Sequence, residues 1–265
     1  MTEHLYFAHA NSFPASVYQK MLTALGQHYT VSYTDCIGHN PAYAIRDCWP
    51  QLVDETIAAI EQGGQGPVWA VGHSLGGILV LYAAIERPDL FKGLVILDSP
   101  LFAPRRAWSI WLAKKLGFID RVTPGGNTLK RRDSWASVEM VHDYFGRKPM
   151  FSRFDPDCLW DYARHGTIDD GHGGRQLKFR PAIEHQIYCT LPHNMHRYRD
   201  RNRVPGLYLA AGDKPVLNAH DLHYVRQRLG LQTDHQPGSH LFPLEQPLAT
   251  AERIIQAFAA MRQAD

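Results

Sequence analysis

Ser74 lies in the sequence Gly72-His73-Ser74-Leu75-Gly76, between a valine-rich apolar run and a helix-forming segment. A serine hydroxyl on such a strand-to-helix turn becomes a nucleophile when a base removes its proton. Glycines two residues before and two residues after the serine let the strand and the helix pass closely. The helix that follows directs unpaired backbone N–H groups at the serine, so we expect the Leu75 N–H to stabilise an oxyanion. The pattern therefore predicts acyl transfer on Ser74.

A base must accompany this serine. Histidine is the side chain whose ordinary pKa suits removal of the hydroxyl proton, and the chain contains 15 histidines. Position selects His240, because the stretch 238–247 follows the place expected for the last strand and precedes the last helix. The order nucleophile, acid, histidine along the chain is one of the known orders of a catalytic triad.

The elements that must position these side chains alternate between strands and helices. Apolar runs predict strands at residues 5–8, 29–33, 68–71, 93–97 and 204–211. Periodic segments predict helices at residues 17–26, 54–61, 78–86, 219–229 and 248–261. Such alternation is typical of a parallel sheet, which gathers reactive groups at the carboxyl ends of its strands. His9, Ser74 and Asp98 all lie at such ends.

The pattern changes between residues 101 and 203, where aromatic and basic residues and glycine turns replace clear buried strands. We expect a largely helical cap here, inserted after the strand that ends near Asp98. The core domain is then formed by residues 1–100 and 204–265. Six aromatic residues of the insert would either line an apolar acyl pocket or pack the cap itself, namely Trp108, Trp111, Trp135, Phe151, Phe154 and Trp160.

Three segments of the chain resemble the signature regions of the α/β-hydrolase superfamily, namely residues 72–77, 9–14 and 238–247. The resemblance spans nearly the whole chain outside the cap and implies an α/β-hydrolase fold, with a mostly parallel central sheet flanked by helices. It also implies that the Asn11 N–H is the second oxyanion donor, although Ala10 stands where relatives usually carry glycine. His9 and His73 match positions at which relatives use histidine for packing and hydrogen bonding.

The resemblance leaves two positions open for the carboxylate that fixes the histidine tautomer. In most relatives the acid follows the strand after the cap, in a Gly-x-x-Asp pattern. This chain has Gly212-Asp213-Lys214-Pro215, so Pro215 occupies the usual acid position and Asp213 lies two residues early. Other members of the family place the acid after the strand that follows the elbow helix, where this chain has Asp98. We favour Asp98, with Asp213 as the alternative acid, and the true acid must reach the second ring nitrogen of the histidine.

Composition gives no reason to expect a macromolecular partner. The chain has 265 residues, 45% of them hydrophobic and 20% charged, with a formal net charge of +2. This near-neutral balance, and basic clusters that lack a nucleic-acid motif, argue against nucleic acid or an anionic membrane. With neither a signal core nor an apolar run of membrane-spanning length in the sequence, we expect a soluble cytoplasmic protein.

No metal or cofactor is expected from the sequence. The four cysteines, Cys36, Cys48, Cys158 and Cys189, lack close paired spacing, which predicts free thiols and neither a disulfide framework nor a zinc site. The segment 169–172, Asp-Asp-Gly-His, contains ligand-type side chains but no accompanying Cys/His array, so a polar turn is expected.

These observations together predict a cofactor-independent serine hydrolase. Ser74 attacks the carbonyl of a carboxylic ester or a related small-molecule acyl compound, and water activated by His240 then releases the acid from the acyl-enzyme. A thioesterase or a hydrolase of carbon–carbon bonds is an alternative, because one triad serves all three reactions. Two other classes remain open: a ligand-binding or sensor protein with slow or no turnover, favoured by Pro215 at the usual acid position, and a protein-interaction module that uses the cap.

Overall fold

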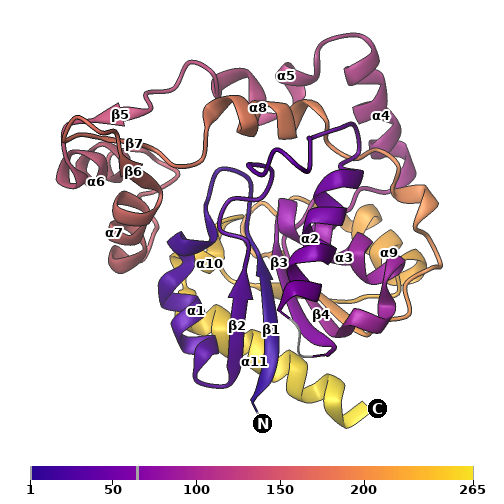
Figure 1. Cartoon of the computed structure of the whole chain (residues 1–265). Coiled ribbons are helices and arrows are strands. Elements are labelled where there is room, and N and C mark those ends of the chain that lie inside the picture. The colour runs from indigo at the N-terminus through magenta and orange to yellow at the C-terminus, as the bar shows by residue number, and fades with distance from the viewer. Residues whose placement is uncertain (1, 64–65, 265) are drawn as a thin grey trace.

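A six-stranded parallel sheet forms the centre of the molecule (Figure 1). The computed structural model describes residues 2–63 and 66–264, so residues 1, 64–65 and 265 of the expected core ranges lie outside it. Its strands are β1 (Glu3–Ala8), β2 (Tyr29–Tyr33), β3 (Val68–His73), β4 (Phe91–Leu97), β8 (Gly206–Ala211) and β9 (Gln232–Gln236). Their order is β2-β1-β3-β4-β8-β9, and every neighbouring pair is parallel. The predicted parallel α/β sheet is confirmed.

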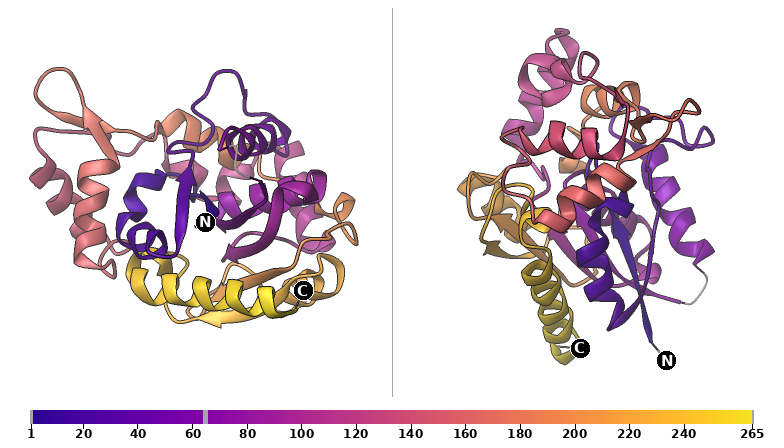
Figure 2. Two further views of the ribbon diagram at one scale, coloured as in Figure 1. Left: turned by 60° about the horizontal axis from the view of Figure 1, so that its bottom comes forward. Right: turned by 90° about the vertical axis from the view of Figure 1, so that its left-hand side faces the viewer.

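Apolar side chains cover both faces of this sheet because helices pack on both sides, as in other parallel sheets. On β1, Tyr6 and Ala8 face one hydrophobic cluster while Leu5 and Phe7 face the other, and none is more than 1% exposed. The first cluster is covered by α2 (Pro50–Gln62), α3 (Leu75–Glu86) and α9 (Ala219–Arg228). The second is covered by α1 (Gln19–Gly26) and α11 (Pro247–Ala264). Figure 2 shows α11 and α2 on opposite sides of the sheet.

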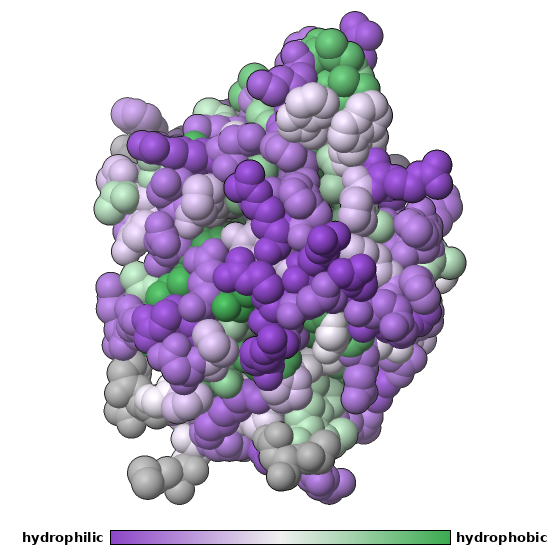
Figure 3. Space-filling model, turned by 90° about the vertical axis from the view of Figure 1, so that its right-hand side faces the viewer, coloured by the Kyte–Doolittle hydropathy of each residue, from purple (hydrophilic) through white to green (hydrophobic). Residues whose placement is uncertain are grey.

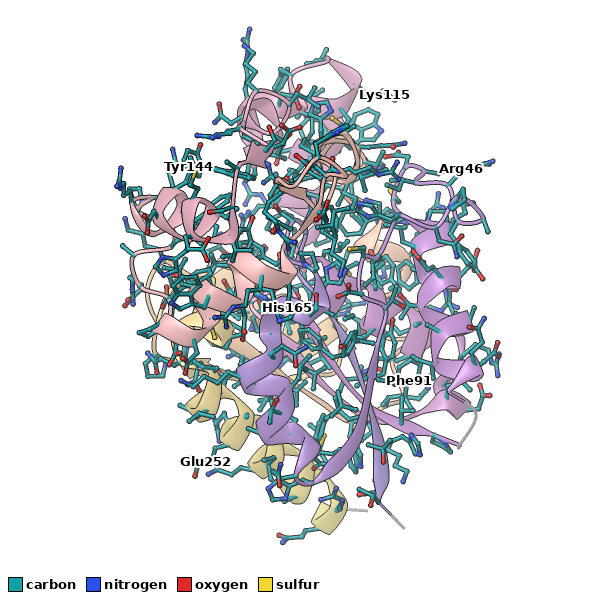
Figure 4. The ribbon with its side chains drawn as sticks, turned by 60° about the vertical axis from the view of Figure 1, so that its left-hand side comes forward. Arg46, Phe91, Lys115, Tyr144, His165 and Glu252 are labelled. Carbon is teal, nitrogen blue, oxygen red and sulfur yellow. The ribbon has the colours of Figure 1, made fainter. Side chains whose placement is uncertain are left out.

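The residues between β4 and β8 form a largely helical insert above the carboxyl ends of the strands (Figure 1). Its helices are α4 (Pro104–Lys115), α5 (Ile119–Val122), α6 (Val138–Gly146), α7 (Pro156–His165) and α8 (Pro181–Cys189). It also holds a small antiparallel sheet of β5 (Ser134–Trp135), β7 (Arg175–Leu177) and β6 (Thr167–Asp169). In Figure 4, Lys115 and Tyr144 of this insert lie at the opposite end of the molecule from Glu252 on α11.

Short helical turns complete the chain at η1 (Ala15–Tyr18), η2 (Pro88–Leu90), η3 (Pro124–Asn127), η4 (Met195–Arg197) and α10 (Phe242–Glu245). The four cysteines, all within the described residues, are free thiols. No helix in the described part of the chain is both long and apolar enough to cross a membrane.

The insert is tied to the sheet because its apolar side chains join both hydrophobic clusters. Phe151 and Tyr162 pack against Phe13, which follows β1, with ring centroids 6.1 and 5.6 Å away. Phe179 and Ile187, near and in α8, join the cluster under α2 and α3. These contacts hold the insert directly above the residues at the strand ends.

Candidate active site

The carboxyl end of β3 turns sharply into α3 at Ser74, whose φ is 52° and ψ is −111°. Such a conformation is strained for a residue with a side chain and persists only where the surroundings enforce it. A Cβ on Gly72 would stand 2.4 Å from the Gly76 carbonyl oxygen, and a Cβ on Gly76 would stand 2.1 Å from the Ala8 carbonyl oxygen. Strand, helix and the neighbouring strand therefore pass too closely for any side chain at these glycines, which fixes the position of Ser74.

Three side chains from separate loops meet beside this turn. His240 Nε2 lies 3.1 Å from Ser74 Oγ, and His240 Nδ1 lies 2.8 Å from Asp98 Oδ2. A carboxylate only accepts hydrogen bonds, so Nδ1–H donates to Asp98 and Nε2 is free to accept the serine hydrogen. The arrangement can therefore carry a proton from Ser74 to His240 while Asp98 stabilises the imidazolium.

Asp98 is fully buried at the carboxyl end of β4. The backbone N–H groups of Ala211 and Val216 donate to its Oδ1, both at 3.2 Å. These donors, together with the His240 N–H, satisfy a charged carboxylate that would otherwise be costly to bury.

The carboxylate of Asp213, the alternative acid, is paired with Arg153 and not with His240. Its side chain is 59% exposed and pairs with Arg153 at 2.9 Å. Its backbone N–H donates to the Gly238 carbonyl at 2.9 Å, so the loop is anchored with the carboxylate turned outward. The structure thus brings Asp98 to His240 and directs Asp213 to Arg153.

His73 holds the backbone of the histidine loop. Its Nε2 lies 2.8 Å from the His240 carbonyl oxygen, which only accepts, so Nε2–H is the donor. Its Nδ1 accepts from the Tyr18 hydroxyl at 2.8 Å. Burial, with a smaller contribution from His240, lowers the pKa of His73 well below its ordinary value, so the ring is neutral near pH 7. Both ring nitrogens are already engaged, which leaves neither free to act on a substrate.

Two further supports of the site were not predicted from the sequence. Glu245 in α10 accepts from the Ser239 N–H at 2.9 Å and from the Ser239 hydroxyl at 2.5 Å, and so anchors the residue before His240. Arg131 Nη1 lies 2.8 Å from Ser12 Oγ and 2.8 Å from Glu184 Oε2. Glu245 lies within the signature stretch that pointed to His240, whereas the segments of Arg131 and Glu184 meet only in three dimensions.

Of the two predicted oxyanion donors, Leu75 is the first residue of α3 and Asn11 lies in the loop after β1. The Gly76 N–H donates to the His9 carbonyl at 3.1 Å, which joins the loop after β1 to the elbow. The Asn11 side chain donates to the Glu184 carbonyl at 3.2 Å, which ties the same loop to α8. Within residues 2–63 and 66–264, no hydrogen bond joins the Leu75 N–H or the Asn11 N–H to another protein group. Both N–H groups are therefore available to a negatively charged oxygen.

A cavity of about 1330 Å³ opens beside Ser74 and His240, between the strand ends and the insert. Its apolar walls include Phe13, Phe102, Phe145, Phe151, Tyr162 and Tyr188. Such a volume exceeds that of a typical small-ligand pocket of about 300–1,000 Å³, so an acyl group and a sizeable leaving group fit together.

The aromatic residues expected at the pocket or within the cap take different positions: one lines the cavity, others pack within the insert, and one is exposed. Phe151 lines the cavity, whereas Trp135 is buried against Phe145 with ring centroids 5.4 Å apart. Trp160 stacks on His142 at 4.0 Å. Trp108 is 60% exposed on α4. Figure 3 shows a mostly hydrophilic face whose top, where Figure 1 places α4 and α5, carries an apolar group.

His9 is buried completely after β1 and makes a hydrogen bond through each ring nitrogen. Its Nε2 accepts from the Ile37 N–H at 2.8 Å, and its Nδ1 lies 2.8 Å from the Ala10 carbonyl oxygen. Burial lowers the pKa of His9 from 6.5 to about 4. The folded protein therefore holds this ring neutral at a pH at which the unfolded chain protonates it.

The free energy of unfolding of the variant His9→Gln should depend less on pH than that of the wild type. The unfolded state binds the proton first, so the contribution of His9 is complete above pH 6.5 and is lost as the pH falls toward 4. By pH 5 the wild type should have lost about 2 kcal/mol through this group. Urea unfolding at pH 7.5 and pH 5 measures the difference, and all other titrating groups cancel between the two proteins. Equal pH dependence in both proteins would contradict the assignment.

Comparison with known proteins shows the family of the chain. A model of the Alpha/beta hydrolase family matches residues 5–253. The chain is 29% identical over 109 residues to the pimeloyl-[acyl-carrier protein] methyl ester esterase of Proteus mirabilis (strain HI4320), covering 40% of each chain. It is 31% identical over 128 residues to the (E)-2-((N-methylformamido)methylene)succinate hydrolase of Acinetobacter baylyi (strain ATCC 33305 / BD413 / ADP1), covering 46% of this chain and 49% of that one. The matched parts are thus less than half of each relative's length.

Solved structures resemble the whole chain. The crystal structure of E-2-(acetamidomethylene)succinate hydrolase superposes with a TM-score of 0.76 and 20% identity, covering 97% of this chain and 91% of that one. The thioesterase domain from the curacin biosynthetic pathway gives a TM-score of 0.69 and 17% identity, covering 96% and 91%. At such identities these likenesses concern the fold.

Proposed function

We propose that this chain, which belongs to the alpha/beta hydrolase family, is a serine hydrolase that cleaves a carboxylic ester or a related acyl compound. The observation that carries the proposal is the position of His240, 3.1 Å from the Ser74 hydroxyl and 2.8 Å from the Asp98 carboxylate. The names of the relatives in Proteus mirabilis and Acinetobacter baylyi, an esterase and a hydrolase, support hydrolysis as the reaction class.

The reaction proceeds through an acyl-enzyme. Ser74 Oγ attacks the carbonyl carbon while His240 Nε2 accepts its proton, and Asp98 stabilises the imidazolium. The Leu75 and Asn11 N–H groups donate to the oxyanion of the tetrahedral intermediate. The intermediate collapses, His240 returns the proton to the leaving alcohol, and the acyl group remains on Ser74. Water then attacks with His240 as base, which releases the carboxylic acid and restores the serine.

Residues 101–203 act in this proposal as a cap on a core of residues 1–100 and 204–265. The insert supplies Phe145, Phe151, Tyr162 and Tyr188 to the cavity walls, so it determines which acyl groups fit beside Ser74. The partner is a small-molecule acyl substrate. A non-catalytic sensor is less well supported. Pro215 at the usual acid position was the reason to expect one, and that reason no longer applies when Asp98 contacts His240.

A panel of p-nitrophenyl esters and acyl thioesters of graded chain length tests the function. We expect turnover that peaks at one chain length, because an apolar cavity gains from each methylene until its walls are reached. The best ester should reach a kcat/KM of at least about 10⁴ M⁻¹s⁻¹. The readout is kcat/KM for each compound, with thermal stabilisation measured in parallel. Stabilisation by intact acyl compounds without any turnover would instead identify a ligand-binding protein.

A further inference from the structure

Three side chains of metal-ligating types, from α5 and α8 of the insert, lie close together. We propose that Asp120, His185 and Cys189 form a binding site for a transition-metal ion of the zinc class. His185 Nε2 lies 3.0 Å from Asp120 Oδ1, and Cys189 Sγ lies 3.5 Å from each of these two atoms. One ligand atom of each residue thus lies within reach of a single point between them.

These separations are those of a tetrahedral zinc site. Zinc bonds of about 2.3 Å to sulfur and about 2.0 Å to nitrogen and oxygen, at tetrahedral angles, place sulfur about 3.5 Å from either partner and nitrogen about 3.3 Å from oxygen. The observed pairwise distances of 3.5, 3.5 and 3.0 Å lie within a few tenths of an ångström of these values. The sulfur also lies 3.8 Å from His185 Nδ1 and so stands over the ring, and the imidazole must turn for Nε2 to face an ion beside the sulfur.

Local structure fixes each ligand. His185 and Cys189 are four residues apart on α8, so their side chains lie one above the other on the same face of the helix. Asp120 comes from α5 and packs against η3, where a Cβ on Gly125 would stand 3.0 Å from Asp120 Oδ1. The ion would therefore join two helices of the insert.

The donor types and their exposure also suit such an ion. A thiolate, an imidazole and one carboxylate favour zinc or cobalt over magnesium and calcium, which prefer oxygen ligands alone. The side chain of Asp120 is 46% exposed and that of His185 is 25% exposed, so an ion enters from solvent and water completes the fourth position. The Cys189 thiol proton passes to solvent when the metal–sulfur bond forms.

A second cluster, Asp47, Cys48 and His193, is a poorer site. Cys48 Sγ lies 3.4 Å from His193 Nδ1, but Asp47 is paired with Lys114. Lys114 Nζ is held in place by the Leu191 carbonyl at 2.9 Å, so a fixed positive charge opposes a metal ion there. This cluster supplies a matched control for the first.

Cobalt binding to the 265-residue chain, without a histidine tag, tests the proposal. The apoprotein is prepared with a chelator and titrated with Co²⁺, and separately with Zn²⁺. We expect about one ion per chain and a near-ultraviolet thiolate-to-cobalt charge-transfer band, because Cys189 is a ligand. Cys189→Ser should lose the band, and His185→Gln should weaken binding by more than about 100-fold, beyond the usual effect of an indirect partner. Cys48→Ser should leave both band and affinity unchanged.

Thermal unfolding gives a second readout that does not depend on enzymatic activity. Zinc should raise the Tm of the wild type and of Cys48→Ser, and should leave the Tm of Cys189→Ser and His185→Gln unchanged. Circular dichroism shows whether each variant is folded. A wild type without the band, a band that survives in Cys189→Ser, or a band lost in Cys48→Ser would overturn the assignment. Because none of these readouts involves Ser74, they remain independent of the proposed hydrolase activity.

Discussion

Ser74→Ala should abolish turnover of the best ester, with kcat reduced about 10⁶-fold relative to the wild type. The methyl group cannot form the acyl-enzyme, so only binding and the Leu75 and Asn11 N–H groups remain to stabilise the transition state. Removal of a small hydroxyl at a turn fixed by Gly72 and Gly76 should leave the fold intact. Steady-state kcat and KM on the best ester are the measurement, with circular dichroism as the check of folding.

The matched control is Ser152→Ala, an exposed serine of the insert whose hydroxyl donates only to the nearby Pro149 carbonyl at 2.9 Å. Its kcat should equal that of the wild type. A Ser74→Ala protein that kept more than a few per cent of the activity would show that another nucleophile acts.

Asp98→Asn should lower kcat about 10⁴-fold, because an amide favours the wrong tautomer of His240 and no longer stabilises its positive charge. The geometry of the loop should be retained, since the amide oxygen can still accept from the Ala211 and Val216 N–H groups. KM should change little, because the Asp98 carboxylate lies behind the histidine, away from the substrate. The measurement is kcat and KM on the best ester.

The paired variant is Asp213→Asn. The Asp213 carboxylate is 59% exposed and pairs with Arg153, and exposed ion pairs contribute only about 0–1 kcal/mol to stability. This variant should retain nearly full kcat. The assignment of the acid would be reversed if Asp213→Asn lost activity by orders of magnitude while Asp98→Asn did not.

Five of the six core strands were predicted, because each contains a short apolar run. The sixth, β9, was missed because its five residues, Gln-Thr-Asp-His-Gln, are all polar. The strand predicted at 29–33 matches β2, whereas the strand predicted at 68–71 continues in β3 to His73. That extension includes Gly72 and His73, which carry no apolar strand signal and are held by pairing with β1 and β4. The insert was less predictable, because β5, β6 and β7 have two or three residues each, too few for an alternating pattern.

The residues of the site were also only partly predictable from the sequence. Ser74 and His240 stand in local patterns that the sequence displays directly. The choice between Asp98 and Asp213 depended on where the loop after β8 runs, which is decided by the Val216 N–H donating to Asp98 and by the Arg153 pair. No local sequence pattern indicates these contacts.

The cluster of Asp120, His185 and Cys189 was also not predictable from a local sequence pattern. Asp120 and His185 are 65 residues apart in the sequence, so no short spacing pattern connects them. His185 and Cys189 are four residues apart in the sequence, but two ligands alone do not indicate a metal site. The third ligand, Asp120, is brought to them by α5.

Covalent labelling with a fluorophosphonate, followed by mass spectrometry of the digested protein, is the direct test of Ser74 as the nucleophile, since such probes react only with an activated nucleophile. We expect one label per chain, on the peptide that contains Ser74, with loss of esterase activity in proportion to labelling. We also expect no label in Ser74→Ala and much slower labelling in His240→Ala. A label on another residue, or full turnover by protein labelled completely at Ser74, would show that Ser74 is not the nucleophile.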